Sequence, residues 1–111
     1  MIEAIIRTYM LQTLGGIPVY NVVPKAVPKR YYVVEKTGGG MKNRVRTALI
    51  TVQSYADSMA EAASMNEDAI NVLIDNDVEE IASVRLNSDY NYSNPTTKQF
   101  RYQAVFDVVH Y

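Results

Sequence analysis

Residues 44–61 read RVRTALITVQSYADSMAE and place the two best-marked elements of the chain in direct succession. The apolar centre, Ala48 to Val52, predicts a central β-strand that is covered on both faces. Ser58 and Glu61 have the spacing of a capping box, in which the Ser58 hydroxyl accepts from the amide of residue 61 and Glu61 reaches back to the amide of residue 58. This stretch therefore predicts a strand that leads directly into a helix.

The other elements follow from hydrophobic periodicity and from turn residues. Apolar residues at helical spacing predict an N-terminal helix that Gly15 and Gly16 end. Alternating apolar and polar residues predict two C-terminal strands, joined by a turn at 93–97 into a long hairpin. In chain order we expect a helix over 2–14, a weak edge strand over 17–23, strands over 30–36 and 44–55, a helix over 58–75, and strands over 82–92 and 99–111.

Helices that pack on an antiparallel sheet of about four to five strands form an α+β two-layer sandwich. With 111 residues, the chain corresponds to a single domain, 1–111. The N-terminal stretch is interrupted by Glu3 and Arg7 and lacks the pattern of a signal peptide. No apolar run is long enough to predict a membrane-spanning segment.

Three consecutive glycines, Gly38 to Gly40, lie between the predicted strands over 30–36 and 44–55. Cations follow them, and a glycine-rich loop before cations can cradle a phosphate. A Walker-type loop, however, ends in GK[ST] and continues into a helix whose amides face the phosphate. Here no GK[ST] occurs and a strand pattern follows. The glycines therefore predict a mobile hairpin loop and no phosphate cofactor.

A net charge of −1 conceals a division of the charges along the chain. Residues 25–46 hold one acid, Glu35, beside Lys25, Lys29, Arg30, Lys36, Lys42, Arg44 and Arg46. Residues 57–89 hold one cation, Arg85, beside Asp57, Glu61, Glu67, Asp68, Asp75, Asp77, Glu79, Glu80 and Asp89. The basic segment could attract nucleic acid, or it could meet the acidic segment of a second copy head to tail, as in a ring. Both segments could also be plain solvated faces.

Residue types that carry most enzyme chemistry are scarce. The absence of cysteine excludes disulfides, thiolate zinc sites and cysteine nucleophiles, and it agrees with a cytosolic protein. His110, the one histidine, is expected to be a surface strand residue, and no serine stands in a G-x-S-x-G pattern. Asp75 and Asp77 lack the further ligands and the turn glycine of a calcium loop. We therefore expect no catalytic, cofactor-binding or metal-binding residues.

Tyrosine is frequent, with nine among 111 residues. Those expected on strands are Tyr31, Tyr32, Tyr90, Tyr92, Tyr102 and Tyr111. Aromatic rings among cations can stack on single-stranded bases, but no RNP-like motif is present and the isoelectric point is about 5.7. Tyrosine also suits protein interfaces, where an apolar ring and a polar tip meet a partly wet surface. We favour the interface interpretation.

Taken in order, these features resemble the tail terminator (tail-completion) family of long-tailed bacteriophages and prophages. The resemblance covers nearly all of the chain. It rests on the N-terminal helix closed by Leu14-Gly15-Gly16, the entry Ile17-Pro18-Val19-Tyr20, the strand from Arg30 to Glu35, the variable glycine loop, the strand from Ala48 to Ala56, the helix start Ser58-x-x-Glu61-Ala62, and the closing hairpin whose last strand opens with Phe100-Arg101-Tyr102.

The resemblance implies a small α+β protein that assembles into a ring, a hexamer in that family. Such a ring caps the finished tail tube at the head-proximal end of the tail, stops its polymerisation and presents a surface to the head connector or stopper. It implies a virion component that is assembled in the bacterial cytoplasm, with DNA passing through the lumen without sequence-specific binding. Neither catalysis nor a cofactor is implied.

For the ring, we expect the helix over 58–75 of one subunit to meet segment 25–46 of the next, with tyrosines of the last hairpin contributing. The predicted interface residues are Lys36, Lys42, Arg44, Arg46, Glu61, Asp68, Asp75, Tyr90, Tyr92 and Arg101. Two alternatives stay open: a head-side neck or stopper protein, and a single-stranded nucleic-acid or small-ligand module that uses the tyrosine strands. An enzyme ranks third.

Overall fold

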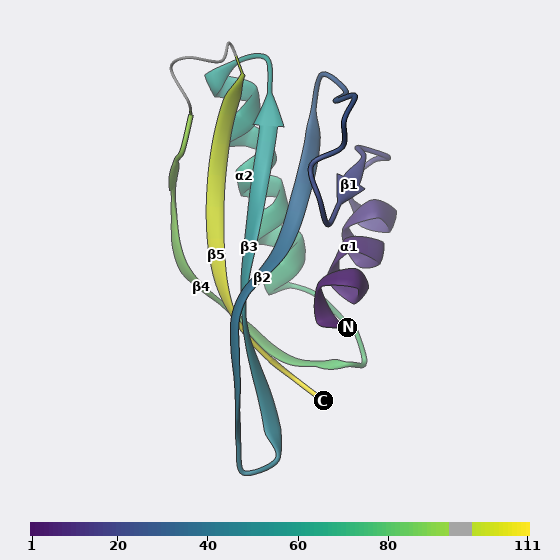
Figure 1. Ribbon diagram of the computed structural model, residues 1–111, viewed down its shortest axis with the longest axis vertical. Coiled ribbons are helices and arrows are strands. Elements are labelled where there is room, and N and C mark those ends of the chain that lie inside the picture. The colour runs from purple at the N-terminus through teal and green to yellow at the C-terminus, as the bar shows by residue number, and fades with distance from the viewer. Residues whose placement is uncertain (94–98) are drawn as a thin grey trace.

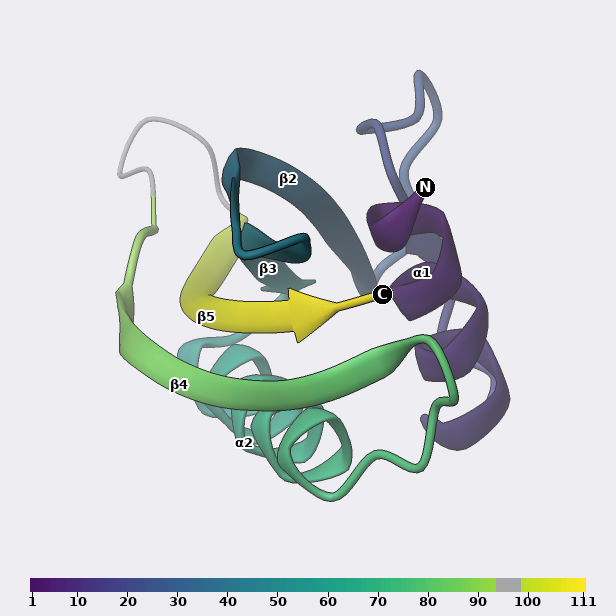
Figure 2. The same cartoon turned by 90° about the horizontal axis from the view of Figure 1, so that it is seen from below.

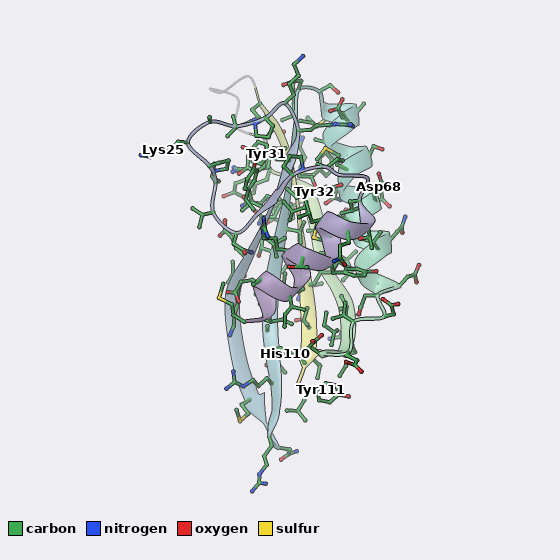
Figure 3. All side chains as sticks on the ribbon, turned by 90° about the vertical axis from the view of Figure 1, so that its right-hand side faces the viewer. Lys25, Tyr31, Tyr32, Asp68, His110 and Tyr111 are labelled. Atoms are coloured by element: carbon green, nitrogen blue, oxygen red, sulfur yellow. The ribbon has the colours of Figure 1, made fainter. Side chains whose placement is uncertain are left out.

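The computed structural model describes residues 1–93 and 99–111, except for the side chain of Lys42. The elements are α1 (Ile2–Thr13), β1 (Val19–Tyr20), β2 (Tyr31–Lys42), β3 (Val45–Ala56), α2 (Met59–Ile74), β4 (Ile81–Asn91) and β5 (Phe100–His110). The strands form one sheet in the order β1-β2-β3-β5-β4. Figure 1 looks onto the sheet with α2 behind it, and Figure 3 shows both helices on the same side. The predicted α+β two-layer fold is confirmed.

The expectation of a wholly antiparallel sheet is wrong at one edge. The pairs β2–β3, β3–β5 and β5–β4 are antiparallel, but β1 runs parallel to β2, with Val19 opposite Tyr32 and Tyr20 opposite Val33. Residues 21–30 form a crossover that returns the chain to the end of the sheet where β1 begins, so β2 must run in the same direction. The strand expected over 17–23 shrinks to the two residues that pair in this way.

Helix α1 begins and ends close to its predicted bounds. Ile2, Ile6 and Met10 are buried along one stripe, as the helical spacing predicts. Gly15 and Gly16 follow with φ angles of 65° and 81°. Glycine adopts this left-handed region without the steric strain of a Cβ, so the pair ends the helix and redirects the chain into β1.

Helix α2 begins at the predicted cap. The Ser58 hydroxyl accepts a hydrogen bond from the Glu61 amide at 3.2 Å, which supplies one of the orphan donors of the first turn. The face turned to the sheet comprises Ala62, Met65, Asn66, Ala69 and Leu73. Its alanines allow the helix to approach the strands closely, and the main core lies between this helix, α1 and the sheet.

Two neighbouring tyrosines of β2 lie on opposite sides of the sheet, because successive side chains of a strand alternate. Tyr32 points toward α2 and donates a hydrogen bond to the Met65 carbonyl oxygen at 2.9 Å (Figure 3). Tyr31 joins Val33 and Tyr55 in a second, small cluster on the helix-free face. The sequence predicts that the central strand, β3, is covered on both faces. On the helix-free face, β3 is covered mainly where this cluster lies.

The glycine run is not the hairpin loop that we expected. Gly38 to Gly40 belong to β2 and pair with Leu49, Ala48 and Thr47 of β3. The chain reverses later, at Asn43 and Arg44, whose φ angles of 52° and 67° are those of a two-residue turn with both central residues left-handed. Such a turn matches the twist of the paired strands, so the pairing extends through the glycines to Lys42 opposite Val45.

His110 is buried, not exposed as the sequence suggested. Strand β5 lies between β3 and β4, and His110 is paired with Arg46 on one side and with Ile81 on the other. A position near the end of the printed chain is thus interior to the sheet. The hairpin of β4 and β5 is confirmed by its antiparallel register, whereas most of the turn predicted at 93–97 lies outside the described residues.

Candidate assembly surfaces

The β2–β3 hairpin forms an arm that extends past the other elements at one end of the long axis (Figure 1). The molecule measures 45 Å along that axis and 25 Å across it. We call residues 41–46 the hairpin tip. Its Met41 and Val45 side chains are 62% and 41% exposed, and Arg44 and Arg46 are exposed as well. An arm of this shape places apolar and cationic groups together, away from the protein's own core.

Both faces of the hairpin tip carry apolar groups. Met41 is opposite Arg46 in the register, so these two side chains share one face. Val45 precedes Arg46 in β3 and therefore lies on the other face. Arg44, at the apex, has the positive φ that costs a residue with a Cβ about 1 kcal/mol. The tip is therefore able to contact a partner on both sides.

The acidic residues divide between two places. Glu67 and Asp68 are exposed on α2, and Glu61 is half-buried in its first turn. Asp75 ends α2, and Asp77, Glu79 and Glu80 follow in the connection to β4, all of them exposed. In the part of the chain that the structure describes, the one ion pair is Arg85 with Asp107, so the basic and acidic segments of a single copy do not neutralise each other.

A groove of about 500 Å³ lies between α1 and the connection from α2 to β4. We call it the α1 groove; it is lined by Met1, Ala4, Ile5, Thr8, Tyr9, Gln12, Asp77, Val78 and Glu80. Figure 2 shows this connection passing beside α1. Ile5, Tyr9 and Val78 are half-buried and form an apolar floor, while Asp77 and Glu80 stand exposed at the rim.

Tyr9 anchors the floor of this groove. Its hydroxyl donates to the carbonyl oxygen of Val72 at 2.8 Å and so ties α1 to α2. The pKa of Tyr9 is raised, first by burial and then by the negative charges of Asp77 and Asp75. The groove therefore combines an apolar surface with a negative field.

A row of aromatic side chains crosses the helix-free face. Tyr20 meets Tyr31 edge to face at 6.0 Å between ring centroids, and Tyr31 stacks on Tyr55 at 4.5 Å. The guanidinium carbon of Arg101 lies 5.4 Å from the centroid of the Tyr55 ring and 4.3 Å from that of Tyr92. Since these residues come from neighbouring strands, the row links the strands across one end of the sheet.

The predicted interface residues do not form one surface. Arg46 is paired with His110 at the arm end of the sheet, whereas Arg101 is paired with Tyr55 at the other end. His110 is nine residue positions after Arg101 along the strand, a distance on the order of 30 Å. Arg101 is half-buried in the aromatic row, and Tyr90 and Tyr92 are exposed beside it.

Lys36, Arg44 and Arg46 lie on the arm, exposed, while the side chain of Lys42 is outside the description. Glu61, Asp68 and Asp75 lie at the start, the middle and the end of α2. No local sequence signal marks the α1 groove or the stacked Tyr31 and Tyr55, because each joins segments far apart in the chain. The helical spacing of apolar residues includes Ile5 and Tyr9 in the apolar stripe of α1, but it does not reveal the groove beside them.

Within residues 1–93 and 99–111, no three histidine or carboxylate side chains come together as a metal site would require. No described helix has the length and apolar character needed to cross a bilayer.

No protein-family model matches the chain, and no curated protein sequence matches it. Among solved structures, the fold is similar to a chain of the virion of a native gene transfer agent particle. The two share 13% sequence identity at a TM-score of 0.66, over 91% of this chain and 83% of the other. At this identity the comparison establishes a common α+β fold across nearly the whole chain.

Proposed function

We propose that this protein is a structural component of a phage-like virion, and more specifically a tail terminator. In this role, copies of the chain form a ring on the end of the tail tube, stop its growth and offer a surface to the head connector. The observation that carries the virion role is the fold shared with a virion chain, over 91% of this chain and 83% of that chain. The role needs no catalysis and no cofactor.

Two features of the molecule support a ring. Closed rings use heterologous contacts, in which one surface of a subunit meets a different surface of the next. The basic, partly apolar hairpin tip and the acidic segment around α2 are two such surfaces on one copy. Affinity for DNA rises with the number of phosphate contacts that a protein makes. A net charge of −1 therefore also suits a lumen through which DNA passes without being held.

Loss of the gene in a particle-producing strain tests the role. If the protein terminates tails, electron micrographs of the mutant show tails of abnormal length, and expression of the wild-type protein from a plasmid restores uniform tails. Normal-length tails that are separate from leaky heads would instead support a head-side stopper. Unaltered particles would contradict both assignments.

Titration with a fluorescent single-stranded oligonucleotide at several salt concentrations tests the nucleic-acid alternative. A module that contacts phosphates would bind, and its affinity would fall steeply as salt rises. For a tail terminator we expect no measurable binding at physiological salt.

A further inference from the structure

We propose that the hairpin tip of one copy docks in the α1 groove of the next copy, with Met41 on the apolar floor and Arg44 and Arg46 at the acidic rim. This inference rests on the proposed ring. The sequence predicts that the basic segment of one copy contacts the exposed side of α2 in the next copy. In this proposal it contacts the groove between α1 and residues 75–80 instead.

The two surfaces are complementary in polarity. The hairpin tip exposes two apolar side chains, Met41 and Val45, beside two cations. The groove exposes an apolar floor of Ile5, Tyr9 and Val78 beside the carboxylates of Asp77 and Glu80. Methionine suits such a contact because its unbranched chain adapts to an irregular surface.

The charges are complementary as well. Four of the six residues from 75 to 80 are acidic, namely Asp75, Asp77, Glu79 and Glu80, and all four are exposed. The tip carries Arg44 and Arg46, which form no ion pair among the described residues. Two of these acids, Asp77 and Glu80, line the α1 groove directly.

The geometry fits a contact between copies. The tip projects beyond the body along the long axis (Figure 1). The groove is lined by α1 and by the connection from α2 to β4. The contact is therefore heterologous, and repetition of it generates a ring if the rotation closes. The strained φ of Arg44, where glycine would be relaxed, indicates that a long cationic side chain at the apex has a use beyond folding.

Site-specific crosslinking tests the contact directly, since the chain contains no cysteine of its own. In the double variant Met41→Cys with Gln12→Cys, each copy carries one cysteine on the tip and one at the groove. Under mild oxidation we expect ladders of disulfide-linked oligomers on a non-reducing gel. The control pair Met41→Cys with Ala60→Cys, whose second cysteine is exposed on α2, should give several-fold less product. Stronger ladders from the control pair would overturn the proposal in favour of the α2 face.

Charge exchange provides an independent measurement. The variant Arg44→Glu with Arg46→Glu, and the variant Asp77→Lys with Glu80→Lys, should each raise the protein concentration at half-assembly about tenfold or more. Combining all four substitutions should restore assembly. Matched controls are Lys25→Glu with Lys29→Glu and Glu67→Lys with Asp68→Lys, which alter the same number of exposed charges elsewhere and should leave assembly within about twofold. Circular dichroism melting of each variant verifies folding.

The outcomes separate the docking proposal from the proposed function. Rings that form in the wild type and persist in both charge variants would overturn the docking while leaving the ring intact. Normal tails after loss of the gene, together with a wild-type protein that stays monomeric at every concentration, would overturn the function and the docking together.

Discussion

The hydroxyl of Tyr32 donates a hydrogen bond to the carbonyl oxygen of Met65 at 2.9 Å, and this bond joins the start of β2 to the middle of α2. Both residues are buried, Tyr32 completely. A buried phenol needs such a partner, because an unpaired polar group in the core costs about 1–3 kcal/mol. The sheet and the helix are thereby held in one relative position.

Substitution Tyr32→Phe should lower the free energy of unfolding by about 1 kcal/mol, because it removes this hydrogen bond and keeps the ring. Urea denaturation monitored by circular dichroism measures the change. Tyr31→Phe is the matched control. Its hydroxyl is 3.5 Å from Gln99 Oε1, at the limit of a hydrogen bond, so we expect a smaller loss. An equal or larger loss for Tyr31→Phe would contradict the assignment.

Alkaline pH should destabilise the protein through Tyr32. Burial raises the pKa of Tyr32 in the folded state above the ordinary 10.0, and the charge of Asp68 acts in the same direction. Above about pH 10 the unfolded chain releases a proton that the folded protein keeps, so the stabilisation is complete below that pH and is lost as pH rises. The free energy of unfolding should fall by about 1.4 kcal/mol per pH unit from this group.

Denaturation series between about pH 9 and about pH 11.5 measure this slope. The Tyr32→Phe variant should show a shallower decline, whereas the remaining decline reflects Tyr9 and Tyr31, whose pKa values are also raised by burial. Identical slopes for the variant and the wild type would contradict the prediction.

Glycines of this chain should differ in their tolerance of alanine. Gly40 has ordinary strand backbone, and an added Cβ would lie 3.4 Å from Thr47 Oγ1, so Gly40→Ala should be neutral or stabilise by about 0.5 kcal/mol. Gly15 has a φ of 65° and open space around it. Gly15→Ala should therefore cost about 1 kcal/mol through backbone strain alone. Thermal melting of the two variants checks the contrast, and a reversed order would show that the glycines of β2 adopt a turn.

Substitution Arg44→Gly should separate stability from assembly. Glycine after Asn43 gives the preferred Asn-Gly pair of a two-residue hairpin turn, so we expect stabilisation by about 0.5–1 kcal/mol. Loss of the cation should at the same time weaken assembly. Denaturation and mass photometry on the same preparation measure both effects. Lys25→Gly, outside the hairpin, should not weaken assembly.

Arg101→Lys should destabilise the aromatic row although the charge is kept. The guanidinium donates to Tyr55 Oη and to the carbonyl oxygen of Tyr92, each at 3.0 Å, and it lies over both rings within cation–π distance. Lysine lacks this planar fork, so we expect a loss of about 1–2 kcal/mol. Arg85→Lys is the control, because the Arg85 side chain is 83% exposed and its ion pair with Asp107 measures 3.8 Å. It should change stability by less than about 0.5 kcal/mol.

The elements of this protein follow from local pattern. Apolar spacing in residues 2–10, the left-handed preference of Gly15 and Gly16, and the Ser58 cap each act over a few residues, and the structure contains all three. Alternation likewise marks β4 and β5. Such signals depend on the residues themselves, because side-chain periodicity and backbone preference are short-range properties.

The hairpin tip shows where local preference is overruled. Glycine favours turns, so the run of three glycines predicted a loop at residues 38–40. The pairing of β2 with β3 continues through them, and the turn forms at Asn43 and Arg44 instead. The hydrogen bonds of an extended ladder outweigh both the flexibility of the glycines and the strain at Arg44.

The candidate assembly surfaces depend on contacts between distant segments. The sequence predicted the charge division and the exposed cations, but the α1 groove exists only because residues 77–80 pass beside α1. The strand order likewise buries His110 and separates Arg101 from Arg46 by the length of β5. Strand order and helix packing are settled by the burial of the whole core, which is a long-range property of the folded chain. Local pattern thus determines the helices and strands, and tertiary packing determines which of their exposed residues form one surface.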